Sequence, residues 1–276
     1  MAGSGTSADP YIVSTWADFK SYINQRGKYI RFAADIEPTG SDVSGVVINW
    51  NARNVDGDGH TINNFTGYFN VGTASDCFDE TKNLKFRNLD NRYSGLFRTD
   101  STTGATYTDI INCSFEGYTR AAYLFYFGSL GYFCPRVSRC SFNLRLGNSS
   151  FQLMFPYTTS TYNSPQTNNC NVKLKYEGVT PDGTKNLFYT TARNIFLNIE
   201  DGNNGTILLN NIGDSIIIGK NVSIANTSSS DMVGRIVYDS DNITMSGEPA
   251  STRFRAMTNA DIKNVSALQA VGFPIE

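Results

Sequence analysis

Charged side chains are scarce in this sequence: Asp, Glu, Lys and Arg make up 17% of the 276 residues, and the formal net charge is −2. A near-neutral chain has no broad positive field of the kind that attracts nucleic acid, so we expect no nucleic-acid partner. No apolar run is long enough to span a bilayer, and we expect no membrane insertion. The first residues, MAGSGTSADPYIV, hold neither a basic nor an apolar stretch and predict no secretory signal.

Histidine and paired cysteine motifs are also nearly absent. The single histidine, His60, would have to serve any Ser–His–Asp or Cys–His arrangement, and no partner is evident beside it. The five cysteines form no Cys-x-x-Cys spacing, which indicates reduced thiols rather than a zinc site or a disulfide framework. The sequence therefore predicts no catalytic residue, no metal and no cofactor.

His60 lies in the segment NVDGDGHTINNF, residues 54–65, whose alternating acidic residues resemble a calcium loop. An EF-hand loop needs oxygen ligands at its positions 1, 3 and 5, glycine at 6 and a bidentate glutamate at 12. The segment meets the first four needs, but its position 12 is Phe65. We interpret it as a turn with His60 at the surface.

What the chain has in excess is Asn, Ser, Thr, Gly, Tyr and Phe, a composition typical of β-rich, turn-rich proteins. Segments of the form Asn–apolar–x–apolar recur about every 27 residues, as in solenoid repeats, and begin at 54, 83, 112, 139, 169, 194, 221 and 242. A second apolar series follows them in constant phase, at 67, 95, 123, 153, 187, 207 and 235. A strand with one apolar face cannot bury it alone, so two alternating families of strands predict stacked coils.

Alignment of the coils predicts two inward-facing columns of side chains. The first column is Val55, Leu84, Cys113, Cys140, Cys170, Ile195, Val222 and Ile243. The second column is Phe86, Phe115, Phe142, Val172, Leu197, Ile224 and Met245. Three cysteines thereby become small core hydrophobes, and we expect free thiols although adjacent coils would bring Cys113 and Cys140 within disulfide reach.

Asparagine precedes most members of the first column, at 54, 83, 112, 169, 194, 221 and 242, and Arg139 is the exception. Asparagine tolerates the left-handed backbone region, and its amide both donates and accepts hydrogen bonds. We therefore expect the same turn to recur from coil to coil.

Both ends carry the signal of a short helix that would cover the open edge of a solenoid. The signal is a Thr-x-x-Asp motif, a capping box, at residues 15–18 and again at 258–261. The apolar residues of the two expected helices are Trp16, Phe19, Ile23, Ile262, Val265 and Leu268, and their stops are Gly27, Gly272 and Pro274.

The opening GSGTSADPYIVSTWADFKSYI and the turn DGDGHTINNF resemble the N-terminal cap and the first full coil of right-handed parallel β-helix proteins, a superfamily that includes pectate lyases, bacterial adhesins and phage tailspikes. The resemblance implies an all-β fold: a single-stranded right-handed parallel β-helix of about eight coils with short capping helices at both ends. We expect one domain over residues 1–276, with a cap at 1–30, coils at 31–250 and a second cap at 251–276. These motifs specify a fold rather than an activity.

Enzymes of this architecture carry residues that are missing here. Polygalacturonases have a Gly-His-Gly element, whereas His60 lies in Gly-His-Thr, and the calcium-binding acidic cluster of pectate lyases is not visible. Acidic residues that follow the strands would meet on neighbouring coils, near the separation that a retaining glycosidase needs. These residues are Asp90, Glu116, Glu177, Glu200 and Asp201. We favour a solvated acidic rim over catalysis as their explanation.

Two stretches in adjacent coils, residues 123–133 and 155–165, are dense in Tyr and Phe. Strand alternation sends half of them inward, and the predicted outward-facing binding residues are Tyr126, Tyr132, Tyr157 and Tyr162. Exposed tyrosines supply rigid amphipathic area for a protein interface or for stacking on sugars, and we favour contact between subunits.

Taken together, these features favour a non-enzymatic structural or binding protein of a bacteriophage particle: a fibre, spike or capsid-decorating subunit. Its expected partners are itself, as a homotrimer, other virion proteins and a host-surface polysaccharide, and its expected location is the virion exterior. A polysaccharide lyase or hydrolase is one alternative. A bacterial surface adhesin, located on the cell surface or secreted, is the other.

Overall fold

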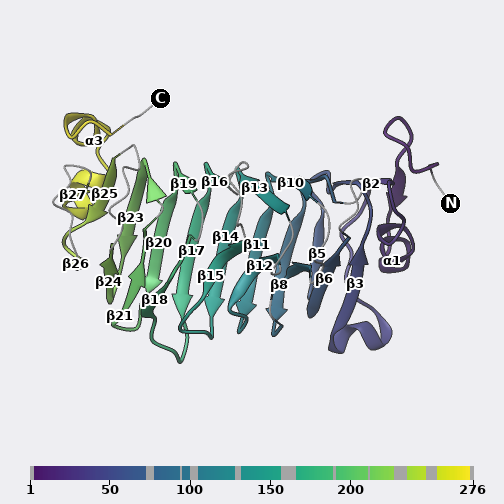
Figure 1. Cartoon of the computed structure of the whole chain (residues 1–276), viewed down its shortest axis with the longest axis horizontal. Helices are drawn as coiled ribbons and strands as arrows, with labels where there is room; N and C mark the ends of the chain where they lie inside the picture. Colours follow the sequence, from purple (N-terminus) through teal and green to yellow (C-terminus); the bar gives the residue numbers. More distant parts are fainter. Residues whose placement is uncertain are drawn as a thin grey trace.

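The computed structural model describes residues 3–72, 78–93, 95–99, 105–127, 132–156, 166–188, 191–210, 212–226, 235–246 and 254–273. Short parallel strands stack one above another along the long axis of the molecule, with helices at the two ends (Figure 1). The predicted all-β parallel β-helix is confirmed.

The strands form four sheets, here called A to D, and every strand pairs in parallel with its neighbours. Sheet A has the order β1 (Tyr11–Val13), β2 (Tyr29–Phe32), β4 (Asn54–Asp56), β7 (Glu80–Lys82), β10 (Ala105–Ile111), β13 (Tyr132–Ser138), β16 (Gln166–Asn168), β19 (Thr191–Arg193), β22 (Ile212–Gly213). Sheet B has the order β5 (Thr61–Asn63), β8 (Lys85–Asn91), β11 (Ser114–Thr119), β14 (Ser141–Leu146), β17 (Asn171–Tyr176), β20 (Phe196–Asp201), β23 (Ser215–Gly219), β25 (Ile236–Asp239), β27 (Phe254–Met257). Sheet C contains β3 (Val46–Trp50), β6 (Gly67–Val71), β9 (Phe97–Thr99), β12 (Tyr123–Phe127) and β15 (Gln152–Pro156), and sheet D contains β18 (Asp182–Asn186), β21 (Gly205–Leu208), β24 (Val222–Ala225) and β26 (Ile243–Ser246).

Each turn of the β-helix takes one strand from sheet A, one from sheet B and one from sheet C or D. In the described part of the chain, seven turns are complete, from β4–β6 to β22–β24, with partial turns before and after them. Sheet C gives way to sheet D above β15, where the Leu153 N–H donates to the Leu187 carbonyl at 2.9 Å. The buried Gln152 amide adds a bond to the Asn186 carbonyl at 2.8 Å, so the third side of the β-helix is continuous across this change of sheet.

The core is a set of stacked columns, as the sequence predicts. Phe86, Phe115 and Phe142 lie directly opposite one another in sheet B, and their rings stack at centroid distances of 5.1 Å. Val172 and Leu197 continue the column, and all five side chains are fully buried. Each ring covers the one below it, which removes apolar surface from water at every turn.

The predicted columns are wrong at both ends, where the register differs from the assumed period. Val55 pairs with Thr81 in sheet A instead of aligning with Leu84. The last members of both columns lie in sheet D instead of in or just before the strands of sheet B: Val222, Ile243, Ile224 and Met245. The reason is that the turns shorten, from 30 residues between Arg139 and Asn169 to 20 between Asn194 and Asp214, so a fixed repeat drifts into the next sheet. The first three of these four displaced residues are nevertheless buried, and Met245 is half-buried.

The corner between sheets A and B repeats one backbone turn, as expected. Asn83, Asn112, Arg139, Asn169 and Asn194 all have left-handed backbone, with φ between 53° and 55°. Side-chain amides bond along this corner ladder, from Asn112 to Asn83 at 2.8 Å and from Asn194 to Asn169 at 2.9 Å. Three predicted members lie elsewhere: Asn54 is in β4, and Asn221 and Asn242 precede strands of sheet D.

Helices form at both predicted places, but only the N-terminal one packs on the main core, and the C-terminal ones pack on a separate cluster. Helix α1 (Trp16–Ile23) has the complete capping box between Thr15 and Asp18, and it ends at Ile23 with Asn24 as its C-cap, before Gly27. A short 3₁₀ helix, η1 (Gly40–Ser44), follows in the first turn. The C-terminal cap is two helices rather than one, α2 (Asn259–Ile262) and α3 (Val265–Ala270). No helix in the described segments has the length and apolar character to cross a membrane.

The C-terminal helices cover the outer face of the last strands of sheet B (Figure 1). Ile262 and Leu268 join Val237 and Met257 in a small second core, against which Ile216 and Phe273 pack. Val265 does not take part, because its side chain is 55% exposed. This second core explains why Ile216 and Ile218 of β23 and Val237 of β25 are apolar on the outer face, where most residues of the middle strands are polar.

Candidate functional site

The predicted calcium-like segment is a turn held by its own acidic side chains. Asp56 accepts hydrogen bonds from the Asp58 N–H and the Asn83 amide, both at 3.0 Å. Asp58 forms an ion pair with Arg31 at 2.7 Å, and His60 Nδ1 lies 3.3 Å from a carboxylate oxygen of Asp35. The described residues contain no cluster of acidic, cysteine or histidine side chains suited to a metal ion.

The predicted outward-facing tyrosines do not form one described cluster. Tyr126 lies in β12 of sheet C with a half-buried side chain, whereas Tyr132 begins β13 of sheet A, on another side of the β-helix. Tyr157 and Tyr162 lie outside the described residues. A common binding surface of these four residues stays a prediction.

Tyr126 instead belongs to an aromatic strip on the outer face of sheet C. Tyr126 packs beside Tyr123 with ring centroids 5.4 Å apart, and it lies opposite Arg98 of β9. The Arg98 guanidinium lies 4.8 Å from the ring of Tyr68, which contacts the 42% exposed Tyr93. We call these five residues the sheet C strip. Sequence reasoning missed Tyr68 because it treated the segment GYF at 67 only as core, although alternation turns its middle residue outward.

The acidic residues singled out in the sequence mostly have cationic or amide partners. Asp90 pairs with Arg92, Glu177 lies 3.5 Å from Arg145, and Glu200 lies 2.8 Å from Lys173. Asp201 accepts from the Asn203 N–H at 2.9 Å and from the Asn221 amide, and these bonds hold the pKa of Asp201 below its ordinary value. Glu116 is exposed and has no hydrogen-bond or ion-pair partner among the described residues.

Three of these acids line a hollow of about 520 Å³ on the outer face of sheet B. We call this hollow the sheet B groove. It crosses five adjacent strands, from β8 to β20, and is lined by Asn88, Leu89, Asp90, Glu116, Gly117, Tyr118, Asn143, Arg145, Lys173, Lys175 and Glu200. The groove therefore offers carboxylates, amides and cations along one continuous surface.

A β-bulge shapes the floor of the groove. Between Phe115 and Gly117 the register of β11 against β8 shifts, and Asn88 takes left-handed backbone with φ of 52°. A Cβ atom at Gly117 would lie 2.4 Å from the backbone N and O of Leu89, and φ there is 150°. Only glycine allows the two strands to approach this closely.

Tyr118, on β11, lines the groove and lies between two arginines. The Arg120 guanidinium carbon lies 5.5 Å from its ring centroid, and that of Arg145 lies 5.6 Å from it. Planar guanidinium groups beside an aromatic ring make a flat, rigid surface that also carries hydrogen-bond donors.

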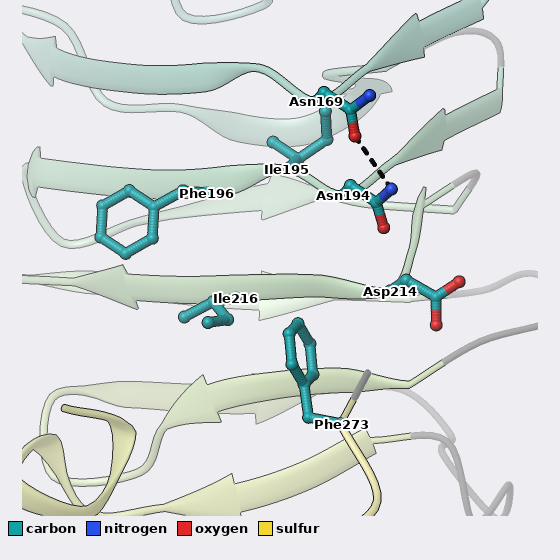
Figure 2. A pocket seen from close by; sticks show the side chains of 7 residues that line it. All are labelled: Asn169, Asn194, Ile195, Phe196, Asp214, Ile216 and Phe273. Carbon is teal, nitrogen blue, oxygen red and sulfur yellow. Dashed lines mark hydrogen bonds between the residues drawn. The ribbon is translucent and has the colours of Figure 1, made fainter. Parts of the chain in front are cut away.

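A second hollow, of about 470 Å³, lies where sheets A and B meet near the C-terminal end (Figure 2). It is lined by Asn169, Asn194, Ile195, Phe196, Asp214, Ile216 and Phe273. We call it the corner pocket. Sequence reasoning missed it because its residues come from four separate segments, and only the asparagines had been recognised as a set.

Comparisons with known proteins do not assign the chain to a family. No family model matches the chain, and no curated protein matches it. A solved structure from Bacteroides ovatus, provisionally described as an immunoglobulin A1 protease, is similar over 97% of this chain and 89% of that chain. The sequence identity is 14% and the TM-score is 0.48.

Proposed function

We propose that the chain is a non-enzymatic binding protein whose sheet B groove holds an extended glycan. The observation that carries the proposal is the groove itself: a polar, charged hollow across five neighbouring strands with a tyrosine in its lining. Parallel strands lie about 4.8 Å apart, so five of them cover about 19 Å, enough for several linked sugar units. Amides, carboxylates and guanidinium groups spaced along that length suit a ligand that presents hydroxyl groups at regular intervals.

Tyr118 supports this assignment because the guanidinium groups of Arg120 and Arg145 lie over its ring and present hydrogen-bond donors to sugar hydroxyl groups. Its ring is fixed by the flanking Arg120 and Arg145, so little side-chain freedom is lost on binding. The ion pairs of Arg145 and Lys173 with neighbouring acids similarly hold the polar groups of the groove in place before a ligand arrives.

The second candidate function is glycoside hydrolysis, because Asp90 and Glu116 line the same hollow. A glycosidase needs two carboxyl groups in defined roles, one of them protonated as an acid. Asp90 is held in an ion pair by Arg92, which leaves Glu116 as the one carboxylate of the two that is unpaired among the described residues. This pairing favours binding over hydrolysis.

For the biological setting, we propose the exterior of a bacteriophage particle, with the chain as a fibre, spike or capsid-decorating subunit. Buried reduced thiols support assembly in a reducing cytoplasm, and the near-neutral surface and rod shape suit a structural role. Within this proposal three copies associate through the sheet C strip, alongside other virion proteins. Light scattering that gives a monomer would count against it and favour the alternative, a bacterial surface or secreted protein.

Glycan binding is tested with a panel of bacterial surface polysaccharides and a matched pair of arginine variants. Arg145 in the groove and Arg136 in sheet A are both 57% exposed and both pair with an acid. Arg145→Ala is expected to weaken binding at least 10-fold, about 1.4 kcal/mol, while Arg136→Ala leaves it unchanged. Release of reducing ends by the wild-type protein would instead show that it hydrolyses glycans. Equal effects of the two variants on binding would show that the glycan does not bind in the groove.

A further inference from the structure

The corner pocket has aromatic walls at the point where the outer face of sheet B changes from the polar residues of the preceding strands to the apolar Ile216 and Val237. Phe196 opens β20, and its side chain is 38% exposed on the outer face of sheet B. The aligned positions in the four preceding strands are all polar: Lys85, Ser114, Ser141 and Asn171. An exposed phenylalanine at this point is not required by the core, which the inward-facing Leu197 already fills.

Phe273 supplies the opposite side and is positioned by the end of α3. The Phe273 N–H donates to the Leu268 carbonyl at 3.0 Å, and the Gly272 N–H donates to Gln269 at 2.8 Å. This pair of bonds is a Schellman motif, which needs the left-handed backbone that Gly272 adopts with φ of 73°. Figure 2 shows the resulting placement, with Phe273 pointing toward Ile216 and Phe196 lying across the pocket from it.

The rim of the pocket is the last part of the corner ladder, and the ladder stops there for a chemical reason. Asn194 donates its amide to Asn169 at 2.9 Å. The next position is Asp214, which has the same left-handed backbone but a carboxylate, and a carboxylate has no proton to donate to Asn194. One oxygen of Asp214 accepts from the Arg235 N–H at 2.9 Å. No described residue donates to Asn194 Oδ1, which in Figure 2 points to the Asp214 side of the pocket.

We propose that the corner pocket binds one or two units of a neutral pyranose glycan, at a site separate from the sheet B groove. Two aromatic rings offer stacking surfaces for the C–H faces of a sugar. Asn194 Oδ1 and the second oxygen of Asp214 offer adjacent acceptors, which two hydroxyl groups of one ring satisfy. A volume of about 470 Å³ lies within the usual range for small-ligand sites, about 300–1,000 Å³. The inference does not depend on the groove, because it uses none of the residues that line it.

The test is saturation-transfer NMR on the full chain with the methyl pyranosides of glucose, galactose, mannose and N-acetylglucosamine. At least one sugar is expected to receive saturation. Phe196→Ser, which restores the polarity found at the aligned positions, should reduce the signal at least 10-fold. Asn171→Ser, at the aligned position one strand away and outside the pocket lining, is the matched control and should leave it unchanged.

Asp214→Asn provides a variant that separates binding from folding. The new amide is able to donate to Asn194 Oδ1 and complete the ladder, so the melting temperature is expected to stay or rise while sugar binding falls at least 10-fold. Arg145→Ala in the groove should leave this signal intact, so failure of the pocket and failure of the groove are distinguishable. The proposal is overturned if no pyranoside receives saturation, if both pocket variants bind as wild type, or if tetramethylammonium, a cationic probe, binds in place of the sugars.

Discussion

The side-chain amide of Asn112 donates to Asn83 Oδ1 at 2.8 Å, and both residues hold left-handed backbone with φ near 53°. Asparagine therefore serves this corner in two ways. It adopts the left-handed backbone conformation, which is unfavourable for most residues, and its side chain forms a hydrogen bond to the next turn. The two contributions can be measured separately. We expect Asn112→Ala to lower the free energy of unfolding by about 2 kcal/mol, about half from each source.

Asn112→Gly is the companion variant, because glycine tolerates the left-handed region but cannot form the bond. It should lower the free energy of unfolding by about 1 kcal/mol in urea denaturation. Equal losses for Ala and Gly would show that the backbone conformation carries no cost at this corner.

Arg139 interrupts the ladder and offers a stabilising substitution. Arg139 has φ of 55°, is exposed, and occupies the position where the neighbouring turns have asparagine. Arg139→Asn relieves the backbone cost and adds bonds to the amides of the adjacent turns, so we expect the free energy of unfolding to rise by about 1 kcal/mol. Thermal and urea unfolding check this, with Arg136→Asn in the adjoining strand as a control that should not stabilise.

Phe115 lies at the centre of the stacked rings, with Phe86 below and Phe142 above it. Phe115→Ala is expected to cost about 3–5 kcal/mol, because it removes a fully buried ring and leaves a cavity. Phe115→Asp places a charge in the column and should prevent soluble folding. The exposed neighbour Glu116→Ala should change stability by less than about 0.5 kcal/mol, and a large loss there would mean that the inward and outward faces are assigned wrongly.

The buried thiols of Cys140 and Cys170 make stability depend on pH. A side-chain hydrogen bond with Cys113, together with burial, raises the pKa of Cys140, and a bond with Cys140 has the same effect on the pKa of Cys170. Unfolded thiols lose their protons near pH 8.5, at about their ordinary pKa, while the folded ones keep them. Their contribution to stability is therefore complete below about pH 8.5 and declines as the pH rises above it.

Urea unfolding at pH 7.5 and pH 9.5 measures this decline. The double variant Cys140→Ala, Cys170→Ala should lose less stability between the two pH values than the wild type does. In the native wild type, iodoacetamide should leave Cys113, Cys140 and Cys170 unmodified, as measured by mass spectrometry of the peptides. Modification of Cys140 in the folded protein would contradict the buried column.

The fold was predictable from the sequence because its signals are local and repeated. The Thr-x-x-Asp motifs of both caps, the asparagine turns and the phenylalanine column each depend on residues a few positions apart or one turn apart. The period failed after Asn194 because the turns became shorter there, and a change in loop length leaves no trace in the strand pattern itself. Free thiols in the first column were also predicted correctly for the three described cysteines.

The candidate sites were much less predictable. The sheet B groove depends on outward-facing residues of five strands and on the bulge at Asn88, which shifts the register by one residue. The corner pocket depends on Phe273 reaching β20 and β23 from the C-terminal segment. A feature visible in the sequence, Phe196 at a position that is polar in four earlier turns, would have indicated this pocket once the register was known.

The repeated corner has one more consequence. At Asn112, Arg139 and Asn169 the chain passes through the same conformation, each time with a sulfur atom just inside. A segment that runs from one corner to the next therefore begins and ends in matching geometry, so whole units can be duplicated or deleted with their junctions intact. The length of such a β-helix is set by its number of turns, and recombination within the gene can change that number.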